Sequence, residues 1–389
     1  MKMKRLNLVT GASGFSGAYV VRDLLNRGEK VIGTDLAPAL ENPKNRRMLE
    51  SIGFDYNHPN LELIPSDLLD KESLKKLFKK PVTHIFHTAS LYDYSASLEL
   101  LRRVNVDGTR NLMEQVLNSD SLEHFIHWST CGVFGKPFTA AQGQKVNLPF
   151  SEESSSPKNT DGPSPEGTYL VNDYSVTKWE QEQMMWRYHR ENKLPLTVVR
   201  PAPIYGPGST YGHGGIILVI AHGILPVIPL DCKNYITTSV HVEDMGRFAI
   251  FAGDRPDLIG EDFNVVDNSI ISYYEFLRYI ALLTGRKMID IPFVRVPKLY
   301  PIMAKAAVIW TNLQQRYGIP RIRVFEIQSA EYVSSSYWLS NRKSLKTGFQ
   351  YLYPDVKEGL KDTVDWFRKM GFLTDKSELM VSGGRTAKT

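Results

Sequence analysis

The apolar positions in the first half of the chain alternate between short continuous runs and runs with a helical repeat. The continuous runs predict buried strands. They are Leu6–Thr10, Val31–Thr34, Leu61–Ile64, Thr83–His87, Phe125–Trp128 and Leu196–Arg200. The helical repeats predict helices at Lys71–Phe78, Leu98–Asn118 and Tyr174–Glu191. Strands that alternate with helices form parallel sheets through right-handed crossovers, so this half predicts a doubly wound α/β domain.

The pattern weakens in the second half of the chain. One further strand is expected near residues 262–267, and helices are expected at Tyr273–Thr284 and Val356–Met370. We therefore expect a sheet domain over residues 1–205, joined by that further strand, and residues 206–375 that form mainly a smaller C-terminal substrate-binding lobe.

Two segments show neither the strand pattern nor the helical repeat of apolar residues. The stretch from Gly135 to Tyr169 is rich in Pro, Ser, Gly and Glu, which predicts a surface excursion. Residues 376–389 are polar and are expected to form a flexible tail.

A glycine-rich turn follows the first predicted strand and precedes a helix. Gly11 allows a tight turn, Gly14 lets a pyrophosphate approach the backbone, and Gly17 lets the helix pack closely on the sheet. The helix N-terminus adds free N–H groups and partial positive charge. Asp35 ends the next strand, where a carboxylate can bind the adenosine ribose hydroxyls. These features, in this order, predict a Rossmann-type dinucleotide site.

A phenol and an ammonium group lie four residues apart on the helix that begins near Tyr174. This spacing places Tyr174 and Lys178 on one helical face. Because a nearby cation favours the phenolate, Lys178 would make Tyr174 a better acid–base group at neutral pH. Thr130, at the end of a neighbouring strand, could hydrogen-bond the substrate oxygen beside Tyr174.

Composition excludes several classes of function. The net charge of +5 comes without an obvious basic block, so we expect no nucleic-acid partner. Two cysteines are too few for a disulfide framework or a structural metal site, which is typical of the reducing cytoplasm. No apolar leader or run of 18 apolar residues appears, so we expect no membrane-crossing segment.

No residue cluster predicts a metal site. His84 and His87 are three apart on a strand and should point to opposite faces. His213 and His241 lack neighbouring ligands in the sequence. Cys131, beside Thr130, is expected to be a small buried side chain rather than a nucleophile.

The motifs together resemble the extended short-chain dehydrogenase/reductase superfamily over nearly the whole chain. The matching runs are Thr10-Gly11-x-x-Gly14-Phe15-x-Gly17, Asp67-Leu68, His87-Thr88-Ala89, Asn105-x-x-Gly108-Thr109, Ser129-Thr130 before Val133-Phe134-Gly135, Tyr174-x-x-x-Lys178, and Arg200-Pro201 before Tyr205-Gly206-Pro207. The departures are Ser16, where a branched apolar residue is usual, and Phe134, where tyrosine is usual.

The resemblance implies a role for each matching residue. Tyr174 would be the acid–base group, Lys178 its activator and a ribose ligand, and Thr130 the hydroxyl that orients the substrate. Asn105 would mainly support the site. The implied cofactor-binding residues are Gly11, Gly14, Phe15, Gly17, Asp35, Asp67, Leu68, Thr88, Ala89, Tyr174, Lys178 and Pro201.

Within the superfamily, the C-terminal part is most similar to the 3β-hydroxysteroid dehydrogenase and sterol-4-carboxylate 3-dehydrogenase branch. The similar runs are Tyr337–Leu345, Thr347-Gly348-Phe349, Val356–Leu360 and Asp365-Trp366-Phe367. This implies an NAD-dependent oxidoreductase that interconverts a secondary alcohol and a ketone on a bulky, sterol-like substrate. A nucleotide-sugar 4-epimerase or dehydratase remains open, with Arg316, Arg321 and Arg323 as candidate diphosphate ligands, as does a non-catalytic NAD-binding scaffold.

The cofactor is expected to be NAD rather than NADP. Asp35 would repel a 2′-phosphate and accept hydrogen bonds from a free ribose diol. The opposing interpretation is that Asp35 faces solvent while Arg46 or Arg47 folds back onto a phosphate.

Two further associations are expected. The segment 296–310 combines an apolar face with flanking lysines and aromatic residues. It could lie on a membrane surface beside the pocket, or instead form a helix that packs in the small lobe or covers the pocket. The protein would then be cytoplasmic and peripheral at a membrane. The family resemblance also implies a homodimer formed through the helices Leu98–Asn118 and Tyr174–Glu191.

Overall fold

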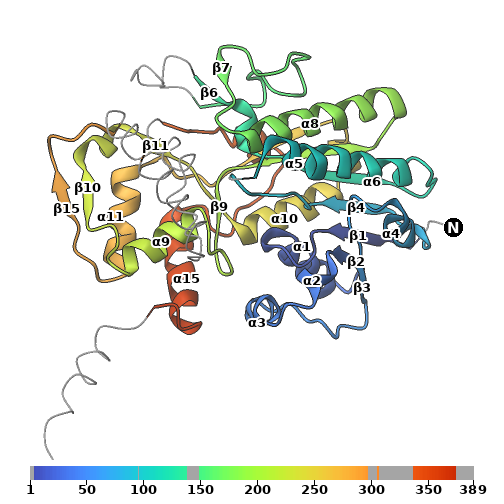
Figure 1. Cartoon of the computed structure of the whole chain (residues 1–389), viewed down its shortest axis with the longest axis horizontal. Coiled ribbons are helices and arrows are strands. Elements are labelled where there is room, and N and C mark those ends of the chain that lie inside the picture. The colour runs from blue at the N-terminus through green and yellow to red at the C-terminus, as the bar shows by residue number, and fades with distance from the viewer. Residues whose placement is uncertain (1–3, 95, 138–148, 297–304, 306–335, 374–389) are drawn as a thin grey trace, which may run out of the picture.

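A computed structural model describes residues 4–94, 96–137, 149–296, 305 and 336–373 (Figure 1). Its centre is a seven-stranded parallel sheet in the order β13-β8-β5-β4-β1-β2-β3. These strands are β1 Leu6–Thr10, β2 Lys30–Asp35, β3 Leu61–Pro65, β4 His84–His87, β5 His124–Trp128, β8 Leu196–Pro201 and β13 Asp262–Val265. The predicted doubly wound α/β fold is confirmed.

Helices cover both faces of the sheet, as Figure 1 shows. The α-helices are α1 Phe15–Asn26, α2 Ala37–Leu40, α3 Pro43–Ser51, α4 Lys71–Lys75, α5 Leu98–Arg102, α6 Gly108–Val116, α8 Asp173–Asn192, α9 His213–Ala221, α10 Val242–Gly253, α11 Tyr273–Leu283, α14 Arg342–Lys346 and α15 Val356–Lys369. Shorter helical turns are η1 Lys76–Phe78, η2 Arg103–Asp107, η3 Cys131–Phe134, η4 Leu230–Asn234 and η5 Pro256–Leu258.

Alternate side chains of the central strands pack into two separate cores, one on each face of the sheet. Val9 and Val199 pack with α1 and α10 on one face, whereas Leu8 and Val198 pack with α4, α6 and α8 on the other. This alternation follows from the two-residue repeat of a strand, and it buries continuous apolar runs that helices cover on both sides.

The smaller lobe is built around a third core, formed by α9, α11 and α15. Ser272 and Glu275 form a reciprocal capping box at the start of α11, which fixes where that helix begins. The remaining short strands are β6 Lys136–Pro137, β7 Thr168–Tyr169, β9 Ile204–Tyr205, β10 Val227–Pro229, β11 Ile236–Thr237, β12 Val240–His241, β14 Ile271–Ser272 and β15 Ile289–Ile291.

The fold differs from the sequence predictions in several places. The expected helix over 98–118 is interrupted by the π-helical turn η2, which separates α5 from α6. Two helices, α2 and α3, lie between β2 and β3, where no element was expected; Asn42 caps the N-terminus of α3 and Pro43 occupies its first position. Helix α10, for which no helix was expected, packs on α1 beside the sheet.

The stretch from Gly135 to Tyr169 is also more than a surface excursion in its described part. Ser156 is fully buried, and the Glu152 carboxylate accepts a 2.7 Å hydrogen bond from the Asn264 N–H of β13. The Phe150 ring stacks on Phe134 with ring centroids 5.4 Å apart. This part of the chain therefore completes the packing around β13.

Candidate active site

A cavity of about 1360 Å³ lies where the carboxyl ends of the parallel strands meet the smaller lobe. This is the edge at which ligands bind in open α/β sheets. Eleven of the twelve cofactor-binding residues predicted from the sequence line it, and the exception is Lys178. The two walls come from stretches far apart in the sequence: the sheet domain supplies one, and α9, α11 and the loops around β10 supply the other.

The glycine-rich turn leaves no room for side chains. Gly11 has φ +69°, and a Cβ there would lie 2.9 Å from Thr88 Oγ1. A Cβ on Gly17 would lie 2.1 Å from the Gly11 carbonyl oxygen. Gly14 is the N-cap of α1 and offers no capping side chain, and the first turn of α1 contains no acidic residue. The turn therefore presents bare backbone and a positive helix end to the cavity, which suits a pyrophosphate.

Asp35 lies at the end of β2, beside this turn. Its Oδ2 accepts hydrogen bonds from the Ser13 N–H at 3.1 Å and from the Ser13 hydroxyl at 2.7 Å. Arg46 lies on the neighbouring helix α3, where it pairs with Glu50 at 3.2 Å and stacks over Tyr56. The Asp35 carboxylate is thus held at the cavity, and Arg46 is engaged elsewhere.

The ends of β3, β4 and β8 form the next part of the wall. Asp67 accepts a 2.9 Å hydrogen bond from the Leu69 N–H, and Leu68 packs so closely on α6 that a Cβ on Gly108 would lie 2.9 Å away. Thr88 donates a 2.7 Å hydrogen bond to the Thr10 carbonyl, which ties β4 to the glycine-rich turn. Ala89 and Pro201 also line the cavity.

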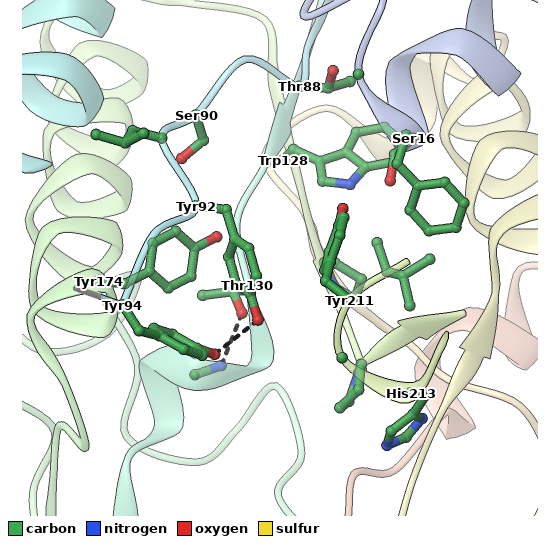
Figure 2. A pocket seen from close by; sticks show the side chains of 18 of the residues that line it. Ser16, Thr88, Ser90, Tyr92, Tyr94, Trp128, Thr130, Tyr174, Tyr211 and His213 are labelled. Carbon is green, nitrogen blue, oxygen red and sulfur yellow. Dashed lines mark hydrogen bonds between the residues drawn. The ribbon is translucent and has the colours of Figure 1, made fainter. Parts of the chain in front are cut away.

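Tyr174 and Thr130 both line the cavity near its middle (Figure 2). The ring of Tyr174 meets Tyr92 edge to face, with centroids 5.0 Å apart, and Figure 2 shows Tyr94 on the same side. Thr130 ends the loop after β5, where its hydroxyl accepts a 3.2 Å hydrogen bond from the Gly132 N–H. Tyr211 forms the opposite side and lies 5.3 Å from Tyr92 between ring centroids.

Lys178 lies behind the cavity wall and is only 1% exposed. Its ammonium donates a 2.7 Å hydrogen bond to the carbonyl of Trp128, a wall residue, and another to the Gln181 side chain. Burial lowers the pKa of Lys178 to about 7, although Glu182 opposes this shift. The spacing of the Tyr-x-x-x-Lys motif predicted a lysine near the ligand, but gave no sign of this buried position.

A buried ionic network supports the loop that carries Thr130. Arg200 on β8 pairs with Glu182 at 2.6 Å and with Asp262 at 2.7 Å, and all three side chains are essentially inaccessible. Ser129, next to Thr130, donates a hydrogen bond to Glu182. Burial raises the pKa of Asp262, but the charges of Arg200, Lys343 and Lys158 outweigh it and hold that pKa well below its usual range.

The histidines of the sheet are buried in the structure. His87 bonds Thr10 at 2.8 Å and Thr109 at 2.9 Å, and burial with the charge of Lys178 lowers its pKa to about 3. Burial raises the pKa of the Cys131 thiol to about 12, so it is not a thiolate at neutral pH. In the part of the chain that the structure describes, no three His, Cys, Asp or Glu side chains converge as metal ligands.

The wall beyond Tyr174 is predominantly apolar. The smaller lobe contributes Ile216, Val219, Leu225, Val227, Leu277, Ile291 and Val296. Of the described residues that line the cavity, none is Lys or Arg, and the charged ones are Asp35 and Asp67 at the cofactor end. This composition suits a ligand whose surface is largely apolar.

Several sequence predictions lie outside the described residues. These are the roles of Arg316, Arg321 and Arg323, the tail 376–389, and all of the segment 296–310 except Val296 and Lys305. Where the structure describes the chain, no helix is long and apolar enough to span a bilayer.

The comparisons with known proteins agree with this geometry. Residues 7–265 match the NAD dependent epimerase/dehydratase family. The UDP-N-acetyl-alpha-D-glucosaminuronate decarboxylase of Bacillus cytotoxicus is 26% identical, over 95% of this chain and 99% of that protein. The 3-beta-hydroxysteroid dehydrogenase of Mycolicibacterium neoaurum is 23% identical, over 97% and 93%.

A solved structure shows the same fold. The UDP-glucose 4-epimerase of Thermus thermophilus, in complex with NAD, superposes with a TM-score of 0.63 at 22% identity, over 93% of this chain and 99% of that one. The matched region includes the glycine-rich turn, Asp35, Thr130, Tyr174 and Lys178. The chain therefore belongs to the NAD-dependent epimerase/dehydratase family of the extended short-chain dehydrogenase/reductases, and is an NAD-dependent enzyme.

Proposed function

We propose that this enzyme is an oxidoreductase that interconverts a secondary alcohol and a ketone on a bulky, apolar, sterol-like substrate. The observation that carries the proposal is a single cavity with two unlike ends. One end has a bare glycine turn and Asp35, and the other has an apolar wall in which no described residue is Lys or Arg. Tyr174 and Thr130 lie on the wall of this same cavity.

The cofactor end has the chemistry needed to hold NAD. The glycine-rich turn and the start of α1 would bind the pyrophosphate, and Asp35 would accept hydrogen bonds from the adenosine ribose. Asp67, Leu68, Thr88 and Ala89 would line the adenine and the adjoining part of the cofactor. Bound NAD supplies the hydride acceptor or donor at its nicotinamide ring, beside which Pro201 would lie.

The proposed catalytic side chains transfer the proton of the substrate hydroxyl. Tyr174 would take the proton of the substrate hydroxyl during oxidation and return it during reduction. The Lys178 ammonium would favour the phenolate form of Tyr174 by its positive charge. Thr130 would hydrogen-bond the substrate oxygen and so align it with Tyr174.

An apolar substrate suits the second end better than a nucleotide sugar. A diphosphate carries negative charge and is commonly bound by Arg or Lys side chains. None of the described lining residues supplies such a group. The apolar side chains of the smaller lobe would instead shield the apolar surface of a sterol-like substrate from water. A 3-beta-hydroxysteroid dehydrogenase is similar over nearly the whole chain, but so is a UDP-sugar decarboxylase, so the assignment rests on the composition of the cavity.

A nucleotide-sugar 4-epimerase or dehydratase is the second candidate, because relatives of the chain include a UDP-glucose 4-epimerase of Vibrio cholerae. In such an enzyme the cofactor is regenerated in each cycle, so no NADH accumulates. This difference separates the two candidates in one assay.

The test is to incubate the purified protein with NAD and a panel of 3β-hydroxysterols, other hydrophobic secondary alcohols and nucleotide sugars. Accumulation of NADH with an apolar alcohol is the expected result. Conversion of a nucleotide sugar without NADH accumulation would establish the second candidate instead. NADH binding with no conversion of any compound in the panel would favour a non-catalytic scaffold.

The remaining associations can be tested on the same preparation. We propose a cytoplasmic homodimer that pairs through the α5–α6 and α8 helices, for which the family resemblance is the support. We also propose that the segment 296–310 contacts a membrane surface. Light scattering would reveal a monomer if the first proposal is wrong, and failure to float with anionic liposomes would overturn the second.

A further inference from the structure

Helix α8 carries a fully buried glutamine three residues after Lys178. The Gln181 amide nitrogen donates hydrogen bonds to the Asn105 carbonyl at 2.9 Å and to the Thr109 hydroxyl at 2.7 Å. An amide nitrogen only donates, so these two bonds fix the orientation of the side chain. Its oxygen consequently faces Lys178, which donates a hydrogen bond to it.

The same row of hydrogen bonds continues to the glycine-rich turn. Because Thr109 accepts from Gln181, its own hydroxyl hydrogen is available for Nε2 of His87, 2.9 Å away. Nδ1 of His87 then carries the proton and donates to the Thr10 hydroxyl at 2.8 Å. This assignment requires a neutral His87, in agreement with its lowered pKa. Gln181 is therefore held in place from both sides.

We propose that Gln181 is a positioning residue that keeps the Lys178 ammonium charged and fixed behind the cavity wall. The role of the ammonium in catalysis rests on the proposed function, but its anchoring by Gln181 does not. A buried cation must be hydrogen-bonded to remain charged. Gln181 and the Trp128 carbonyl supply two acceptors for the three N–H donors of the ammonium.

The groups around Lys178 make its charge sensitive to the loss of the Gln181 acceptor. Its own helix supplies Glu182, which favours the charge but is shared with Arg200 and Ser129. The same helix also carries Tyr174. The β4 and β5 strands supply His87 and His127, whose pKa values are lowered by burial, and β8 supplies Arg200. Burial places the pKa of Lys178 near neutrality, so the loss of one acceptor changes its charge at physiological pH.

The direct test is an NMR titration of the ligand-free, full-length protein labelled with ¹³C-lysine, with the Lys178 signal assigned through Lys178→Met. Gln181→Leu removes the acceptor and should lower the Lys178 midpoint by roughly one pH unit or more, because a hydrogen bond to a charged group contributes about 1.5–3 kcal/mol. Gln181→Glu replaces it with a carboxylate and should raise the midpoint.

A matched control lies on the same helix. Gln183 also donates two hydrogen bonds to carbonyls, those of Thr160 and Gly162, and it does not line the cavity. Gln183→Leu should leave the Lys178 midpoint unchanged. A purely structural role for Gln181 would lower thermal stability in both of its variants without moving the midpoint in opposite directions.

Each outcome decides the proposal. Midpoints that do not move, or that move in the same direction in both variants, overturn it. If Gln181→Leu does not fold, Gln181→Glu decides alone, because an unchanged or lower midpoint contradicts the proposal. Fluorescence titration with NADH across the same pH range is the second measurement. Failure of the unaltered protein to bind NADH would refute the proposed function, while the lysine titration would still decide the role of Gln181.

Discussion

Asp35 Oδ2 accepts hydrogen bonds from both the N–H and the hydroxyl of Ser13, at 3.1 Å and 2.7 Å. This double contact turns a strand-end carboxylate toward the glycine-rich turn, where a ribose diol would bind. A 2′-phosphate at that place would meet the negative charge of Asp35. Cofactor choice should therefore depend on this one side chain.

The first prediction is that Asp35→Asn reduces the preference for NADH over NADPH by roughly tenfold or more, because a hydrogen bond to a charged group is worth about 1.5–3 kcal/mol. Fluorescence titrations with the two reduced cofactors measure it. Ser13→Ala is the control, since it removes only the hydroxyl contact and keeps the charge. An unchanged preference in Asp35→Asn would show that Asp35 does not select the cofactor.

The second prediction concerns the proposed acid–base group. Tyr174→Phe should lower turnover of the alcohol identified in the NADH assay by about 10²–10⁴-fold, the usual contribution of a positioned acid–base group. NADH binding should change little, because the ring is retained. Tyr188→Phe, on the same helix but packed against the core between the sheet and α4, α6 and α8, is the control. Turnover that survives in Tyr174→Phe would contradict the assignment.

The third prediction is a loss of stability in acid. Burial lowers the pKa of His124 and of His213 to about 4, against about 6.5 in an unfolded chain. Between these values the unfolded chain binds more protons than the folded one, so stability falls as the pH drops through this window. Thermal unfolding between pH 7 and pH 4 measures the slope. A flat profile would contradict the burial of neutral histidines.

Two neighbouring histidines should respond oppositely to substitution. His127 is buried, and neither of its ring nitrogens finds a hydrogen-bond partner among the described residues, whereas His87 bonds Thr10 and Thr109. His127→Leu should be neutral or stabilising by about 1 kcal/mol and should flatten the acid slope, because an unpaired buried polar group is costly. His87→Leu should be destabilising because it removes the hydrogen bonds that His87 makes with the Thr10 and Thr109 hydroxyls. Denaturant unfolding of both variants checks the contrast.

The fifth prediction concerns the ionic network behind Thr130. Asp262→Asn removes a partner of Arg200 and should lower the free energy of unfolding by about 3–5 kcal/mol, as expected when a buried pair is broken. Glu261→Gln, next to it but 42% exposed, should cost less than about 1 kcal/mol. Similar losses in the two variants would show that burial of the network does not control its strength.

Local sequence was sufficient for much of this architecture. The strand, glycine turn, helix and Asp35 follow one another directly, so their spacing alone predicted how they fold. The positions of Lys178 and Arg200 could not be predicted in this way, because they depend on partners from other elements. Asp262 lies far from Arg200 in sequence and meets it only because β13 pairs with β8. The π-helical turn at Arg103–Asp107 has no propensity signature that distinguishes it from an ordinary helix.

The pairing of β13 with β8 also bears on how the chain is synthesised. When residues 1–205 have left the ribosome, β8 is an open sheet edge, and Arg200 lacks its Asp262 partner. Unpaired edges of this kind promote association with other chains. The sheet domain therefore cannot reach its final form until α10 and β13 have emerged, and a fragment ending at residue 205 should aggregate. An isolated NAD-binding module of this protein has to include residues 240–265 in addition to the N-terminal half.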